Sequence, residues 1–125
     1  MEKKKYLLVI SNHNPKNWDE AQKVGWDKID FIPFPNILPD KSRIELMNDE
    51  VLQICRMIGE FYSRCDEEGA EGFVNLQGDF TLCYLVYISL YGENVNFVFP
   101  TTDRVVRENP ETGEKLSKFQ FVMWR

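Results

Sequence analysis

Three short polar stretches are the candidates for chemistry in this sequence. Ser11 to Asn14 read SNHN, Gln77 to Thr81 read QGDFT, and Thr101 to Arg104 read TTDR. Each stretch follows a short apolar run, so each is expected where a β-strand ends. Small polar side chains and the free N–H groups of turns and helix starts bind anions such as phosphate. Arg104 is the only cation in the three stretches and would pair with such an anion.

Each stretch taken alone is explained more simply as a turn, because turns favour Ser, Asn, Thr and Gly without any ligand. Gly78 is expected to adopt a φ angle closed to other residues, and Asp79 is expected to cap the helix that follows. His13 is the only histidine, and its loop position makes it no more than a candidate catalyst. Only the placement of all three stretches on one edge of a sheet would favour a ligand site.

The elements that would position these stretches follow from apolar patterning. Continuous or alternating apolar runs predict five strands and a sixth short one, at 6–10, 29–34, 73–76, 95–99, 118–124 and 105–107. The first is expected at the centre of the sheet, and Pro33 argues for an edge position of the second or for a strand that ends early. Residues 100–104 are expected as the exit loop of the 95–99 strand, and 109–113 as a hairpin loop.

Three helices are expected between these strands. Asn17 would cap a short helix over 18–24 that Gly25 ends. An apolar stripe at spacings of 3 and 4 from Ile44 to Cys65 predicts a long helix, capped by Ser42. The third helix, over 80–91, is apolar almost all round, so it is either fully buried or shared with a second chain.

The alternation of strands and helices predicts an α/β fold. We expect a Rossmann-like, mostly parallel sheet with helices on both faces and a C-terminal β-hairpin, in one domain over residues 1–125. In such a sheet the three polar stretches would meet on one rim, which would involve the following residues: Ser11, Asn12, His13, Asn14, Gln77, Gly78, Asp79, Phe80, Thr81, Thr101, Thr102 and Arg104.

Composition narrows the classes of function. A net charge of −5 argues against a long nucleic acid as partner, because tracking a polyanion needs a basic surface. The three cysteines form no CxxC pair, which favours reduced thiols and a cytoplasmic protein. We expect no bound metal, because no His, Cys and Asp cluster has ligand spacing. We expect no cofactor, since glycine-rich nucleotide fingerprints are absent, and neither a signal peptide nor a membrane span.

Four segments together resemble a known family. LLVISNHN, GFVNLQGDFTLCYLV, FPTTDRVVRE and KFQFVMWR are similar, in this order, to motifs of the small stand-alone CRISPR-associated Rossmann (CARF-type) proteins. The resemblance covers nearly the whole chain and is weaker between Asn14 and Gly69.

The resemblance implies a homodimeric ring nuclease of type III CRISPR antiviral defence. Such a protein binds cyclic oligoadenylate, here expected to be cyclic tetra-adenylate, and cleaves it without metal through attack by a 2′-hydroxyl. The positions that match the family motifs are Ser11, His13, Gln77, Gly78, Asp79, Thr101, Thr102 and Arg104. From these we take Arg104, Ser11, His13 and Asp79 as candidate catalytic residues, although the additional Asn12 departs from the usual Ser-His pair.

Two other functions fit the same residues. A sensor or sequestering protein would bind the cyclic nucleotide without cutting it, using the same groups. A small interaction protein would use the apolar third helix and the aromatic C-terminus only to form a dimer.

Overall fold

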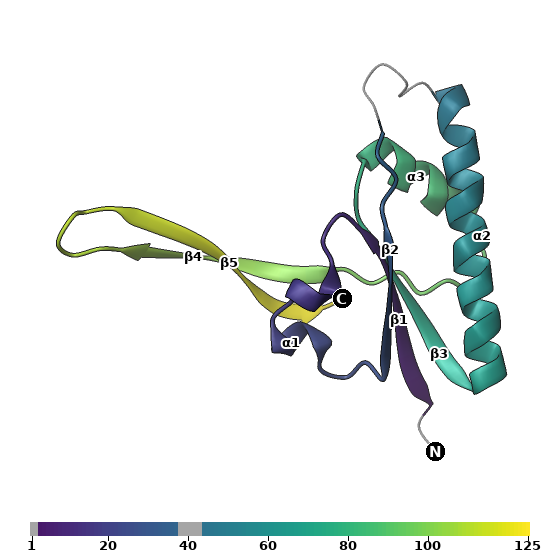
Figure 1. Ribbon diagram of the computed structural model, residues 1–125, viewed down its shortest axis with the longest axis horizontal. Helices are drawn as coiled ribbons and strands as arrows, with labels where there is room; N and C mark the ends of the chain where they lie inside the picture. The colour runs from purple at the N-terminus through teal and green to yellow at the C-terminus, as the bar shows by residue number, and fades with distance from the viewer. Residues whose placement is uncertain (1–2, 38–43) are drawn as a thin grey trace.

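Three parallel strands form the central sheet of the protein (Figure 1). The computed structural model describes residues 3–37 and 44–125, with side chains for all of these except 44–46, 104, 105 and 116–119. β1 (Lys4–Ser11) lies between β2 (Lys28–Pro33) and β3 (Ala70–Leu76). Leu7, Leu8, Val9 and Ile10 are completely buried, which confirms the predicted central strand. The edge position that Pro33 indicated for β2 is also confirmed.

Two helices cover one face of the sheet. The long helix α2 (Ile44–Glu68) buries its predicted stripe from Met47 to Cys65 against β1 and β3, and it ends at Gly69, which has a φ of 67°. α3 (Phe80–Ser89) packs beside α2 and adds Leu82 and Val86 to the same core. The predicted cap at Ser42 lies outside the described residues.

The opposite face carries short elements in place of the single helix predicted over 18–24. A 3-10 helix, η1 (Pro15–Asn17), is followed by one turn of α-helix, α1 (Glu20–Lys23). The prediction that Asn17 caps a helix was wrong, because Trp18 is extended and Asp19 is the N-cap residue of α1. Gly25 follows α1 with a φ of 93°, as its expected role in ending the helix requires.

The C-terminal quarter differs most from the expectation. The strand predicted over 95–99 is a single parallel bridge between Val74 and Phe97. The chain then leaves β3, because Phe99 exchanges backbone hydrogen bonds of 2.7 and 3.0 Å with Arg125. The predicted exit loop is instead the start of β4 (Pro100–Glu108), which pairs antiparallel with β5 (Lys115–Trp124).

We call this two-stranded ribbon the arm. It projects sideways from the middle of the sheet, on the side opposite α2, and its far end lies beside no other element in Figure 1. The fold is therefore a mixed α/β fold with a parallel sheet, helices and a C-terminal antiparallel hairpin, as predicted at this level. None of the described helices is long and apolar enough to cross a lipid bilayer.

Candidate functional site

A pocket lies at the carboxyl end of the parallel sheet, where the sequence places its polar stretches. Asn12 follows β1, Asp79 follows β3, and the segment after β2 contributes the remaining lining residues, Phe34, Pro35, Asn36 and Ile37. The pocket has a volume of about 340 Å³. We call this edge of the sheet the rim. The structure thus brings two of the three polar stretches together and adds a segment that the sequence did not single out.

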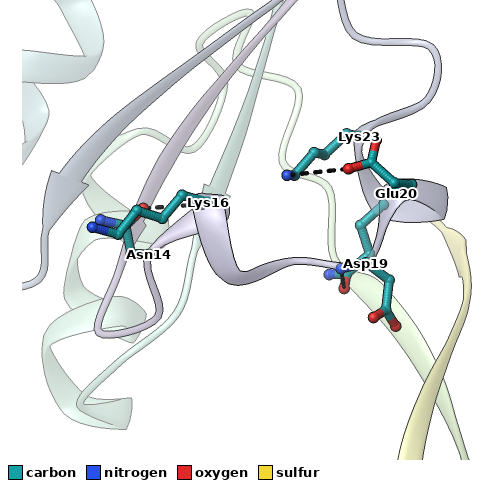
Figure 2. Close-up of polar contacts among 6 residues, drawn as sticks. Asn14, Lys16, Asp19, Glu20 and Lys23 are labelled. Atoms are coloured by element: carbon teal, nitrogen blue, oxygen red, sulfur yellow. Dashed lines mark hydrogen bonds and ion pairs between the residues drawn. The ribbon is translucent and has the colours of Figure 1, made fainter.

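The loop after β1 is held by its own polar side chains. Ser11 is buried, and its Oγ accepts a hydrogen bond of 3.1 Å from the N–H of His13. The side chain of Asn14 caps η1 by accepting a 3.0 Å bond from the N–H of Lys16 (Figure 2). Asn12 and His13 are exposed. Ser11 and Asn14 therefore shape the loop, and Asn12 and His13 are the residues that a ligand can reach.

The turn after β3 presents the first turn of α3 to the rim. The N–H of Gln77 donates to Ile10 O at 3.0 Å, which ties the turn to β1. Asp79 caps α3 as predicted, because its Oδ1 accepts a 3.0 Å bond from the N–H of Leu82. Helix geometry leaves the N–H groups of Phe80 and Thr81 as donors at the positive end of the helix dipole. These two groups are suited to an anion.

Gly78 is required for a reason other than the expected one. Its φ is not positive, so the turn does not need a conformation reserved for glycine. Instead, a Cβ at this position would lie 2.5 Å from three carbons of the Phe34 ring. Only a residue without a side chain permits this contact, which brings the segment after β2 against the turn after β3. The contact therefore sets the shape of one wall of the pocket.

Phe80, one residue beyond the pocket residue Asp79, provides an exposed aromatic surface. Its side chain is 84% exposed and lies parallel to the ring of Tyr84, with 6.4 Å between centroids and 7° between planes. A large aromatic ring this exposed at the start of a helix is available for stacking with a planar ligand, such as a nucleobase. Gln77, three residues before Phe80, and Thr81, directly after it, are also exposed.

The third polar stretch does not lie on the rim but in β4, within the arm. Thr101 Oγ1 donates to Met123 O at 2.8 Å and accepts from Met123 N–H at 3.2 Å, so its hydroxyl fastens the base of the arm. Thr102 is exposed, and Arg104 occupies the β4 position opposite Phe119. The sequence could not show that residues 101–104 lie in a strand, because the polar residues TTDR are equally compatible with a loop after a strand and with the start of a strand.

The described residues of the rim offer neither a reactive thiol nor a cation. Burial raises the pKa of the Cys83 thiol to about 11, so this neighbour of Gly78 stays protonated at neutral pH. None of the described residues that line the pocket is a cation. Across the described chain, no three His, Cys, Asp or Glu side chains gather as ligands for a metal ion would.

The segment after β2 is the part of the site that sequence reasoning missed. Phe34 is 6% exposed and donates its N–H to Ser11 O at 3.1 Å, which fixes the segment against the loop after β1. Asn36 is exposed in the pocket wall. The position of this segment in the sequence could have indicated its role, because the end of a second parallel strand reaches the same edge of the sheet as the ends of its neighbours.

Comparison with known proteins gives a family and no function. A profile of the family described as Uncharacterized protein MJ1673 matches residues 5–125 of the chain. Neither the curated proteins nor the solved structures contain a significant match.

Proposed function

The chain belongs to the MJ1673 family, and we propose that it is a ring nuclease that binds and linearises cyclic oligoadenylate. The observation that carries the proposal is the rim pocket at the carboxyl edge of a parallel sheet, which is lined by Asn12 and by Asp79, the N-cap residue of α3. This is the usual ligand position of Rossmann-like folds. The finer fold assignment, a CARF-type Rossmann domain, is part of the same proposal.

The rim offers two complementary contacts to such a ring. A phosphate group fits the N–H groups of Phe80 and Thr81, where the helix dipole favours negative charge. An adenine base fits the open face of Phe80, since base stacking on an aromatic side chain contributes about 1–3 kcal/mol. The two contacts are adjacent, as phosphate and base are within one nucleotide.

Cleavage follows from positioning. The 2′-oxygen attacks the adjacent phosphorus and forms a P–O2′ bond, while the P–O5′ bond breaks on the opposite side. The proton of the 2′-hydroxyl passes to a base or to water, and the 5′-oxygen is protonated as it leaves. The products are a linear oligoadenylate with a 2′,3′-cyclic phosphate at one end and a 5′-hydroxyl at the other.

The proposed roles of individual residues differ. Arg104 stabilises the charge on the phosphoryl oxygens during attack. His13 is exposed next to Asn12 and is the candidate proton acceptor on the rim. Ser11 and Asp79 hold the backbone that presents the donors, through the hydrogen bonds described above.

A homodimer completes the proposal. A cyclic tetra-adenylate has two-fold symmetry, so two equivalent rims would contact opposite edges of one ring. On α3, Phe80, Tyr84 and Ile88 form a stripe spaced by four residues that is exposed on the monomer, with exposed fractions of 84%, 55% and 52%. An uncharged apolar stripe of this kind suits contact with a second copy. Cytoplasmic location, where a nucleotide messenger is found, belongs to the same proposal.

The deciding experiment offers the purified protein cyclic tri-, tetra- and hexa-adenylate in EDTA and separates the products by chromatography. We expect linear products with a cyclic phosphate end from the tetra-adenylate. Tight binding of an intact ring would favour the sensor. No binding of any of the three rings would leave the exposed stripe of α3, and hence the interaction protein, as the better explanation.

A further inference from the structure

The arm is the least supported part of the molecule. β4 and β5 pair only with each other, and two strands without a covered face are marginally stable in water. Three apolar side chains of the arm are largely exposed, namely Val106 at 54%, Val122 at 55% and Met123 at 56%. A ribbon with this exposure is suited to lying against another surface.

The base of the arm fixes its direction. The Nε1–H of Trp124 donates to Gln22 O at 3.1 Å, and its ring lies 5.3 Å from that of Trp18 and 5.7 Å from that of Trp26. These contacts attach the arm to the face of the sheet opposite α2 (Figure 1). The arm therefore leaves the body in a set direction rather than hanging from a free joint.

This direction separates the arm's cations from the rim of their own copy. At roughly 3.3 Å per residue, the backbone of Arg104 lies about 13 Å along the strand from Pro100, and Arg107 lies farther still. Figure 1 shows the arm leaving the body beside the middle of the sheet, whereas the rim lies beyond Leu76. Meanwhile the described residues lining the rim pocket include no cation. A cation would add a charge-assisted contact with phosphate to those of the two backbone N–H donors.

We infer that, in a two-fold dimer, the arm of each copy lies across the rim of the other and supplies Arg104 to the partner's pocket. The inference rests on the proposed function, because it assumes that the rim takes an anionic ligand. Because each copy gives one arm and receives one, the exchange leaves no arm or rim free for a third copy, and the assembly stops at the dimer. The exchange also joins a rim whose described pocket residues include no cation to a ribbon that carries one.

The surface around the rim suits the arm. Phe80 directly follows the pocket residue Asp79 in the sequence, so the exposed stripe of α3 begins one residue from the pocket lining. From Phe80 to Tyr91 the chain has no charged residue, so an incoming ribbon meets no like charge and no ion to desolvate. Val106 lies two residues beyond Arg104 on the same face of β4, where it would contact this stripe.

Lys41 and Arg43 are a competing source of positive charge. They follow the pocket residue Ile37 in the sequence and lie outside the described residues. The experiment must therefore detect the position of the arm itself, independently of any effect of charge on activity.

Cross-linking between engineered cysteines detects this position without any nucleotide. Thr102 lies on the same face of β4 as Arg104, and Asn36 is exposed in the pocket wall. In a Cys55→Ser background, which removes the half-buried native thiol, Thr102→Cys on a tagged copy is combined with Asn36→Cys on an untagged copy. A short bismaleimide should join the two copies. The matched control is Asp103→Cys, one residue along and on the opposite face, which should react with Asn36→Cys at least 10-fold less.

Several outcomes would overturn the inference. No cross-link between copies would do so, as would equal reaction of Thr102→Cys and Asp103→Cys. When both substitutions are placed in one chain, a cross-link within that chain would show that the arm folds back onto its own rim. Because no nucleotide is present, these results are separate from the fate of the ring nuclease proposal.

Mixing two defective variants tests the contribution of Arg104 if the protein cleaves the ring. Arg104→Gln removes the arm's cation, and His13→Gln removes the proposed proton acceptor of the rim while leaving both pockets open to the ring. Random pairing makes half of the dimers mixed, and each mixed dimer has one intact composite site, so co-refolding should restore about a quarter of the wild-type rate. If Arg104 acted in its own copy, no intact site would form and the rate would stay at that of the separate variants, which would contradict the inference.

Discussion

The ring nuclease proposal gives Asp79 and Arg104 different kinds of role, and single substitutions should separate them. We expect Arg104→Ala to lower single-turnover cleavage of cyclic tetra-adenylate ~10²-fold, because a charged donor to the phosphoryl oxygens is lost, with little change in melting temperature. We expect Asp79→Ala to lose the cap on the Leu82 N–H, at about 1 kcal/mol of stability.

Asp79→Asn serves as the control, because an asparagine can cap α3 without the negative charge. It should restore most of the stability lost in Asp79→Ala. A stable Asp79→Asn that no longer cleaves, beside a nearly normal Arg104→Ala, would reverse the roles and make Asp79 the base.

The contact between Gly78 and Phe34 predicts a large effect for a single methyl group. Gly78→Ala would place Cβ 2.5 Å from the Phe34 ring, so one side of the pocket must shift, at a cost of roughly 1–3 kcal/mol. Gly59→Ala is the matched control: a Cβ there would meet nothing within 4 Å, and an alanine in α2 should stabilise by about 0.5–1 kcal/mol. Urea unfolding measures the change in unfolding free energy for both variants. If Gly78→Ala did not destabilise the protein, the turn would have adapted to the added methyl group.

The Cys83 thiol predicts how stability depends on pH. Its pKa of about 11 in the folded protein lies above the ordinary value of 9.0 for a cysteine thiol, because burial disfavours the thiolate. The unfolded chain therefore loses this proton first, so the contribution to stability is intact below pH 9 and is lost as the pH rises to 11.

Cys83→Ala should have a shallower decline of unfolding free energy between pH 9 and 11 than the wild type, even though its cavity makes it less stable at pH 7. The comparison is needed because burial also raises the pKa values of Cys55, Cys65, Tyr62 and Tyr87. Parallel curves for the two proteins would show that Cys83 is accessible to water.

At the scale of elements, α3 should determine the oligomeric state. The sequence indicated a helix either buried or shared, and the structure leaves Tyr84 and Ile88 more than half exposed. We expect the wild type to be a dimer and Tyr84→Glu to be a monomer, because the substitution places a charge in the middle of the apolar stripe. Light scattering distinguishes the monomer mass of 14.8 kDa from twice that value.

Leu52→Glu is the matched control, since Leu52 is 63% exposed on α2 and away from the stripe. It should leave the mass unchanged. A wild type of monomer mass at micromolar concentration would contradict the dimer proposal.

Elements were predictable from the sequence where burial imposes a clear period. The stripe of α2, the continuous apolar run of β1 and the cap at Asp79 each follow from local patterns. The 95–99 strand and the 18–24 helix were wrong because distant contacts decide them: Arg125 diverts the chain at Phe99, and the extended Trp18 separates two short helical turns. A local sequence pattern does not show which distant residues will form such contacts.

At the scale of the whole molecule, the rim was predictable and the arm was not. Parallel strands necessarily bring their carboxyl ends together, which places Asn12 and Asp79 on one pocket. The position of Arg104 depends on whether the chain continues along the sheet after Phe97, and apolar patterning is the same in both cases.

If the protein is the proposed nuclease, we expect its activity not to require a metal ion. If positioning and the α3 N–H groups are sufficient for cleavage, the rate with EDTA should equal the rate with Mg²⁺ within about 2-fold. Activity that EDTA abolishes and Mn²⁺ restores would contradict the mechanism proposed above.

The tryptophans make the junction of arm and body visible to spectroscopy. All three, Trp18, Trp26 and Trp124, lie in contact where the arm meets the sheet. Fluorescence excited at their absorption band therefore reports on this junction alone, whereas far-ultraviolet circular dichroism is dominated by α2. Recording both signals from one unlabelled sample during denaturation would show directly whether the arm detaches before the sheet unfolds.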